Sequence, residues 1–256
     1  MRMKRHWKKI VIGVVVLVAL VLGGSFIYAK FINKADDPLS QQDVLDKLDA
    51  TTTTIVVDTT AAISTDTTIA AGDTTTTATP ATGVDGNWTI AAESEVGYRV
   101  DESINGFATT ANGRTNAITG SLAIAGTTAT TGDFTVDMTT FKSDESRRDG
   151  QFNGRIMAVD QFPTATFVLT APIDFRKIPA DGETISASAT GDLTLRGTTN
   201  SVTFDLQATF KNNRIGVLGQ IPIVFADYGI PNPSIATIST EDNGLLEFVL
   251  IFDRAA

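Results

Sequence analysis

Residues 143–167 read S-D-E-S-R-R-D-G-Q-F-N-G-R-I-M-A-V-D-Q-F-P-T-A-T-F and carry dense charge of both signs within a chain that otherwise alternates. Few β-branched residues precede Val159, which predicts a loop with a short helix, and Pro163 ends this insert before a strand starts at Thr164. One interpretation is a cap that closes one end of a sheet through internal Arg–carboxylate pairs. The other is a contact with the head group of a ligand. Six charged residues fall within twelve positions: Asp144, Glu145, Arg147, Arg148, Asp149 and Arg155.

On both sides of this insert, from Gly86 onward, apolar and polar residues alternate with period two, which is typical of half-buried strands. Eight antiparallel strands with one apolar face predict an all-β, closed, up-and-down barrel, since closure removes exposed edges. A two-sheet sandwich is the alternative. The predicted strands are Ser94–Val100, Asn116–Ile124, Asp133–Thr140, Thr164–Ile173, Thr184–Arg196, Ser201–Phe210, Arg214–Phe225 and Leu245–Phe252. The predicted turns lie at Asn112-Gly113, Asp181-Gly182, Arg196-Gly197, Asn212-Asn213 and Asn243-Gly244.

The predicted inward positions mix large and small residues. An eight-stranded barrel is just wide enough to be filled by side chains or to hold one small ligand. Small inward residues leave room for a ligand, or they mark bends and bulges, and the pattern alone leaves both interpretations open. The large residues are Phe134, Phe167, Leu193 and Phe204, and the small ones are Gly120, Ala187, Gly191 and Gly197.

Composition excludes several classes of function. Seven Lys/Arg and no acidic residue precede residue 35, which leaves 13 basic and 29 acidic side chains in the remainder, a net charge of −16. An acidic body argues against a nucleic-acid partner, because phosphate binding needs clustered Lys/Arg. The chain has no cysteine, and its one histidine, His6, lies in the N-terminal tail. A disulfide, a thiolate metal site and a Ser-His-Asp triad are therefore excluded from the barrel.

Residues 1–34 predict a membrane anchor. Residues 10–29 carry no charge and follow a basic flank. Twenty such residues in a helix span about 30 Å, the thickness of the hydrocarbon core. The flank places the N-terminus in the cytoplasm and the rest of this single-pass signal-anchor protein outside, in the cell envelope. The alternative, a cleaved signal peptide, requires a shorter apolar core of about 7–15 residues.

Residues 35–85 predict a linker. A short helix is expected from Ser40, with Val44, Leu45 and Leu48 on one side and a capping signal from Asp43. Fifteen of the 32 residues from 51 to 82 are threonine. The remaining residues include too few apolar side chains to build a core. A flexible stalk of this length would hold a domain formed by residues 86–256 on the order of 40 Å from a membrane.

Several blocks, in this order and spacing, resemble the YceI-like family across about residues 86–256. They are W-T-I-A-A-E-S-E-V-G-Y-R-V at 88–100, I-T-G-S-L at 118–122, S-R-R-D at 146–149 leading to Q-F-P-T-A-T-F at 161–167, and A-T-G-D-L-T-L-R-G-T-T at 189–199. The family's opening strand often carries a histidine, where this chain has Glu93-Ser94. The resemblance implies a lipocalin-like barrel that holds an isoprenoid-type lipid or a quinone-like amphiphile. Members often lie in the cell envelope.

A lipid in such a barrel needs an apolar wall, and a phosphate head group needs donors at the mouth, for which arginine is well matched. The candidates for the wall are Val96, Tyr98, Leu122, Phe134, Val136, Phe152, Phe162, Phe167, Gly191 and Leu193. The candidates for the head group are Arg147, Arg148 and Tyr228. For the arginines the alternative is pairing with neighbouring carboxylates, and for Tyr228 it is packing under the Pro-rich loop at 227–233.

Two other classes of function stay open. A barrel filled by its own side chains would be a structural or interaction module displayed on a stalk. Asp144, Glu145 and Asp149 would supply paired carboxylates for a hydrolase, although acidic residues beside arginines more often form ion pairs. We expect binding without catalysis, with no metal and no cofactor apart from the bound lipid. The sequence leaves open whether the protein forms a homodimer.

Overall fold

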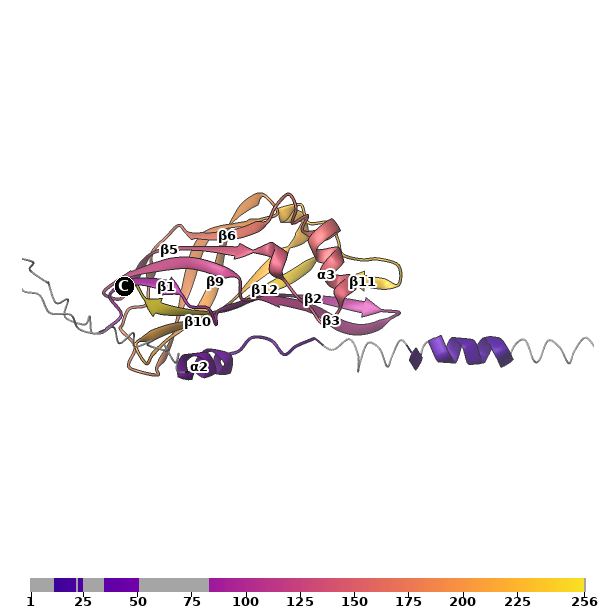
Figure 1. Cartoon of the computed structure of the whole chain (residues 1–256), viewed down its shortest axis with the longest axis horizontal. Coiled ribbons are helices and arrows are strands. Elements are labelled where there is room, and N and C mark those ends of the chain that lie inside the picture. The colour runs from indigo at the N-terminus through magenta and orange to yellow at the C-terminus, as the bar shows by residue number, and fades with distance from the viewer. Residues whose placement is uncertain (1–11, 22, 25–34, 51–82, 256) are drawn as a thin grey trace, which may run out of the picture.

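A computed structural model describes residues 12–21, 23–24, 35–50 and 83–255 of the chain. Eight antiparallel strands form a closed ring in the order β1-β4-β5-β6-β8-β9-β10-β12, and pairing of β12 with β1 closes it (Figure 1). The predicted barrel is therefore confirmed, and the two-sheet sandwich is excluded. The ring strands are β1 Gly86–Ile90, β4 Ile118–Ala125, β5 Thr128–Asp137, β6 Thr164–Leu169, β8 Thr184–Leu195, β9 Thr198–Lys211, β10 Arg214–Val224 and β12 Asn243–Arg254.

Four further strands lie off this ring. β2 (Glu95–Ile104) pairs with the first half of β12 and with β3 (Phe107–Thr115), and its far end pairs with β11 (Ile238–Thr240). These three strands extend past the ring at the end where the charged insert lies (Figure 1). The two-residue strand β7 (Ile173–Asp174) pairs with β5.

Several details of the sequence prediction were wrong. The predicted strand Ser94–Val100 is β2, which lies off the ring, and β1 takes its expected place in the ring. The two strands separate at Ser94, whose buried hydroxyl forms hydrogen bonds with the backbone of Ile251. The predicted turn at Asn112-Gly113 lies inside β3, where Gly113 makes room for the ring of Tyr98. The predicted turn at Asn243-Gly244 is the start of β12.

Two predicted strands also differ in extent. The run Thr164–Ile173 divides into β6 and β7. The run Asp133–Thr140 begins earlier, at Thr128, and its last residues form a 3-10 turn, η2 (Met138–Thr140). In this turn the Asp137 side chain accepts a hydrogen bond from the Thr139 N–H at 2.9 Å. Such a side-chain bond competes with the strand ladder and ends the strand.

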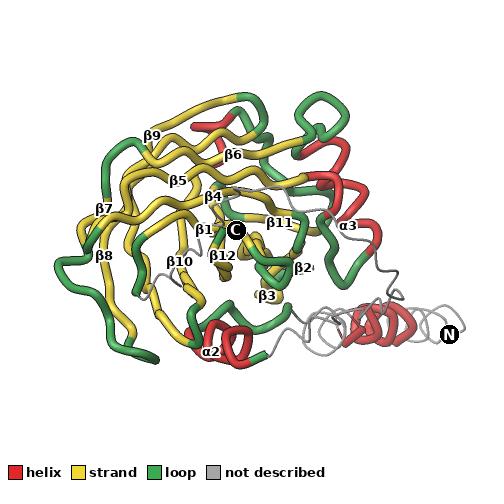
Figure 2. Tube along the Cα trace, turned by 60° about the vertical axis from the view of Figure 1, so that its left-hand side comes forward, coloured by secondary structure: helices red, strands yellow, loops and turns green. Residues whose placement is uncertain are grey.

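The charged insert forms a short helix, as the sequence predicts. Helix α3 (Ser146–Gln151) continues into a π-helical turn, η3 (Phe152–Ile156). Arg155 donates to the backbone carbonyls of Asn232 at 2.9 Å and Pro233 at 2.8 Å, which ties the insert to the loop before β11. The insert therefore lies over one end of the barrel (Figure 2).

The predicted helix after Ser40 is α2 (Gln41–Asp49), and the Asp43 carboxylate accepts from the Ser40 N–H at 2.7 Å. Its buried residues Val44 and Leu48 pack with Leu39 on the outer wall of the barrel. Residues 35–50, which the sequence assigns to the linker, therefore lie against the barrel. The domain limits at 34 and 85 stay a prediction.

The predicted membrane anchor falls mostly outside the described residues. Residues 12–21 and 23–24 are helical. Within the described parts of the chain, no helix is both long enough and apolar enough to cross a bilayer. The Thr-rich residues 51–82, predicted to be a stalk, also lie outside the described residues.

Candidate ligand cavity

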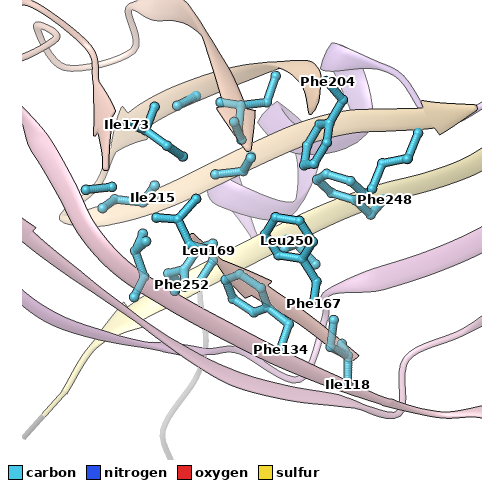
Figure 3. A pocket seen from close by; sticks show the side chains of 18 of the residues that line it. Ile118, Phe134, Phe167, Leu169, Ile173, Phe204, Ile215, Phe248, Leu250 and Phe252 are labelled. Carbon is cyan, nitrogen blue, oxygen red and sulfur yellow. The ribbon is translucent and has the colours of Figure 1, made fainter. Parts of the chain in front are cut away.

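The ring encloses a cavity of about 180 Å³. One water needs about 10–15 Å³ in this measure, so the cavity is far larger than a packing defect. The side chains around it come from every strand of the ring except β1 and are overwhelmingly apolar. Figure 3 shows Phe134, Phe167, Phe204, Phe248 and Leu250 pointing into one shared space. An apolar space of this size suits an apolar ligand better than ordered water.

Six of the ten predicted wall residues line this cavity. Their inward direction follows from the register, because Phe134 is opposite Phe167 and Phe167 is opposite Leu193 on three neighbouring strands. Paired residues in an antiparallel sheet point to the same face. The six are Val96, Leu122, Phe134, Val136, Phe167 and Leu193. The other four, Tyr98, Phe152, Phe162 and Gly191, are not among the lining residues.

Gly191 explains what the small inward residues do. A Cβ at Gly191 would collide with the ring of Phe167, and one at Gly120 would lie 2.6 Å from Cδ1 of Phe134. Gly219 has the same relation to Phe248. Each glycine therefore leaves space that an aromatic ring from the neighbouring strand occupies. Neither of the two interpretations of the sequence is complete, because the space that these glycines leave is occupied by rings of the protein itself.

One end of the cavity is closed by stacked aromatic rings. Phe141, just after η2, lines the cavity, and its ring centroid lies 5.1 Å from that of Phe152 and 5.9 Å from that of Tyr98. Tyr98 and Phe152 stack at 4.8 Å with an interplanar angle of 9°. Burial raises the pKa of Tyr98. The predicted wall residues Tyr98 and Phe152 thus form the closed end behind Phe141.

The opposite end of the cavity carries Lys177, the one charged residue among the described residues that line it. Phe175, Lys177 and Pro179, from the connection between β7 and β8, lie there together with Thr127. Lys177 pairs with Glu183, and their side chains are 55% and 37% exposed. This ion pair lowers the pKa of Glu183. The aromatic end is sealed, whereas the end at Lys177 reaches solvent. The end at Lys177 is therefore the mouth of the cavity.

The predicted head-group residues lie away from the cavity. Arg148 pairs with Asp144 on its own helix and with Glu102 of β2 at 3.5 Å, which is the carboxylate pairing considered as the alternative. Arg147 is exposed on α3. Tyr228 is buried at 3% exposure in the 3-10 turn η4 (Phe225–Tyr228), which raises its pKa, and it does not line the cavity. Their role toward a head group stays a prediction.

The carboxylates of the insert have structural partners. Asp149 accepts from the N–H and hydroxyl of Ser143 at 2.9 and 2.7 Å. Glu145 accepts from the Arg147 N–H at 3.3 Å at the start of α3, and Asp144 pairs with Arg148. These contacts hold the insert in place. Among the described residues, no group of three or more His, Asp or Glu side chains is arranged to hold a metal ion.

Comparison with known proteins agrees with this geometry. The sequence model of the YceI-like domain family matches residues 88–252. The chain belongs to the YceI-like family. A solved polyisoprenoid-binding domain from Saccharophagus degradans, implicated in plant cell wall breakdown, is 17% identical with a TM-score of 0.52, the match covering 66% of this chain and 98% of that one. BcnA from Burkholderia cenocepacia is 21% identical with a TM-score of 0.51, over 63% and 98% of the two chains. No curated protein sequence matches the chain.

The YceI-like cavity also uses residues that the sequence interpretation missed. Phe248, Leu250 and Phe252 alternate along β12 and all line the cavity. Their period of two within the predicted strand Leu245–Phe252 was a usable signal. Phe141 had no such signal, because it follows the 3-10 turn and its position depends on contacts with β2 and the insert.

Proposed function

We propose that this YceI-like barrel holds a long-chain isoprenoid-type lipid or a quinone-like amphiphile in its cavity, as a carrier or store, without chemistry. The observation that carries the proposal is the apolar cavity of about 180 Å³ that runs from the mouth to Phe141. The solved domain from Saccharophagus degradans is described as polyisoprenoid-binding, which supports the same class of ligand.

The wall supplies enough binding energy for such a ligand. Each buried CH₂ contributes about 0.8 kcal/mol, so about twenty buried carbons contribute about 16 kcal/mol, which offsets an association cost of about 4–15 kcal/mol. No charged group of the protein is needed for this part of the affinity. A barrel filled by its own side chains, the structural-module alternative, would leave no cavity of this size.

We also propose that the N-terminal segment anchors the protein in a membrane, with the barrel outside the cytoplasm. The uncharged run at 10–29 and its basic flank support this proposal. In the described helical part, Ile12, Leu17 and Leu20 are 63%, 62% and 68% exposed, so no protein surface covers them. Fractionation with membranes and an intact N-terminus are the expected results. N-terminal sequencing that begins near Lys30 contradicts the anchor.

Filling the cavity tests the lipid proposal. Ala189 is buried on β8 and lines the cavity opposite Phe204, so Ala189→Phe places a ring inside the lumen. Ser186→Phe, exposed on the same strand, is the matched control. We expect the wild-type protein and Ser186→Phe to bind a long prenyl alcohol in a fluorescent-probe displacement titration, and Ala189→Phe to lose at least tenfold in affinity while staying folded by circular dichroism. Equal affinity of all three proteins contradicts the proposal.

A further inference from the structure

On the neighbouring strands β10 and β12 the cavity stops at the same depth. On β10, Ile215, Val217 and Ile221 line it, whereas the next inward residue, Ile223, is buried at 3% exposure and does not. On β12 the lining ends at Leu246. Beyond this depth Phe152 and Met157 of the insert complete a packed core. The lumen is therefore a blind tube, open at the mouth and packed shut at the insert.

Phe141 forms the floor of this tube. It is 3% exposed and is the residue of the aromatic stack that lines the cavity, while Tyr98 and Phe152 lie behind it. The neighbouring Lys142 fixes its backbone through two hydrogen bonds with Arg114 of β3, at 2.8 and 3.0 Å. On the other side Thr140 bonds to Thr115 at 2.6 Å. A ring held from both flanks and backed by two stacked rings cannot swing away without breaking several contacts.

We propose that Phe141, backed by Tyr98 and Phe152, is the stop that sets the longest lipid chain the barrel accepts. The inference rests on the proposed function. A chain that enters tail first from the mouth gains apolar contact with each added isoprene unit until its end meets Phe141. A longer chain must leave its last units outside the mouth, where they gain no burial. The affinity therefore rises with chain length and then breaks at one length.

The series of linear prenyl alcohols with increasing numbers of isoprene units, titrated by probe displacement, locates this break. In the wild-type protein we expect a rise followed by a plateau or a fall. Phe141→Leu replaces the floor with a smaller side chain and so deepens the tube. The break should then move to chains that are longer by one isoprene unit, and the shortest alcohol that is too long for the wild-type tube should bind at least tenfold more tightly. Ala165→Leu, which adds bulk beside the floor on β6, should move the break to shorter chains.

Phe134→Leu is the matched control, because it removes the same volume from the wall at mid-depth. It should change all affinities by a similar factor and leave the position of the break unchanged. The proposal that Phe141 limits the chain length is wrong if the break stays in place in both Phe141→Leu and Ala165→Leu. It is also wrong if the break moves as far in Phe134→Leu. Neither result contradicts lipid binding itself. If no prenyl alcohol binds the wild-type protein, the proposed function fails and the floor with it.

Discussion

The wall made by β10 and β12 has two buried faces that are packed in opposite ways. On the inner face, Leu250 and Phe252 border an open cavity. On the outer face, Val249 and Ile251 are completely buried beneath α2. A strand covered on both sides has no polar face, which is why residues 248–252 read F-V-L-I-F. The difference shows that side chains of α2 fill the space against the outer face, whereas the inner face borders a cavity.

Breaking the outer packing should have the largest effect on stability. Val44 is 0% exposed and lies against Gly216, whose position leaves no space for a Cβ. Val44→Asp forces α2 off the wall, because a carboxylate cannot be buried there without a partner. We expect the free energy of unfolding in a urea titration to fall by about 4 kcal/mol or more. Leu45→Asp, half-buried on the same helix, should cost much less. A small loss for Val44→Asp, no larger than that for Leu45→Asp, would mean that α2 is not a packed part of the barrel.

Two neighbouring residues of β12 compare the faces directly. Ile251→Ala removes a side chain from the filled outer face, and Leu250→Ala removes one that already borders empty space. Large-to-small substitutions cost about 2–5 kcal/mol, and the loss is greatest where every removed atom had close neighbours. We therefore expect a loss near the top of that range for Ile251→Ala and near the bottom for Leu250→Ala. Equal losses in thermal unfolding would show that the inner face is packed as tightly as the outer one.

The buried charge beneath the N-terminal segment should have an intermediate effect. Glu247 is 0% exposed, accepts from the Leu39 N–H at 3.1 Å, and pairs with Arg114 at 3.0 Å. Glu247→Ala leaves the Leu39 N–H without its acceptor, whereas Arg114 keeps its second ion pair, with Glu95 at 3.6 Å. We expect a loss of about 2–3 kcal/mol, and faster limited proteolysis before residue 50. A change below about 0.5 kcal/mol, the usual size of a surface effect, would show that Glu247 does not hold the N-terminal segment against the barrel.

The smallest expected effect concerns the closed end of the tube. Burial raises the pKa of Tyr98, so the folded state holds its proton more tightly than the unfolded chain does. This contribution to stability is fully present below the ordinary tyrosine pKa of about 10 and is lost as the pH rises above it. Tyr98→Phe should change stability at pH 7 by about 1 kcal/mol or less and should flatten the alkaline decline. An unchanged pH profile between pH 9 and 11 would argue that Tyr98 does not titrate in this way.

Period-two patterning predicted the barrel and most of its inward residues, since Phe134, Phe167 and Leu193 each belong to a cleanly alternating run. It did not predict β3, because Asn112-Gly113 has the composition of a turn and only the Tyr98 ring explains the glycine. It assigned α2 to a linker, because a nine-residue amphipathic helix does not reveal what it packs against. The continuous apolar run of β12 was the signal that its outer face also had a cover.

Candidate site residues were predictable where position along a strand sets direction, and they were not where tertiary contacts set it. The wall residues Val96, Leu122 and Val136 follow from alternation. Phe141 and Lys177 lie in connections, whose side-chain directions depend on what the connections pack against. Charge density drew attention to Arg147 and Arg148, but charge marks the insert and gives no information about which end of the barrel is open.

The central claim is that the lumen holds a lipid, and the most direct measurement is the mass of what the protein carries. Full-length protein purified from cells without added ligand is extracted with organic solvent, and the extract is analysed by mass spectrometry beside that of Ala189→Phe. The account predicts an isoprenoid-type or quinone-like lipid, near one molecule per chain, from the wild-type protein and little from the variant. Equal amounts of the same lipids from both proteins, or no lipid from the wild-type protein, would contradict it.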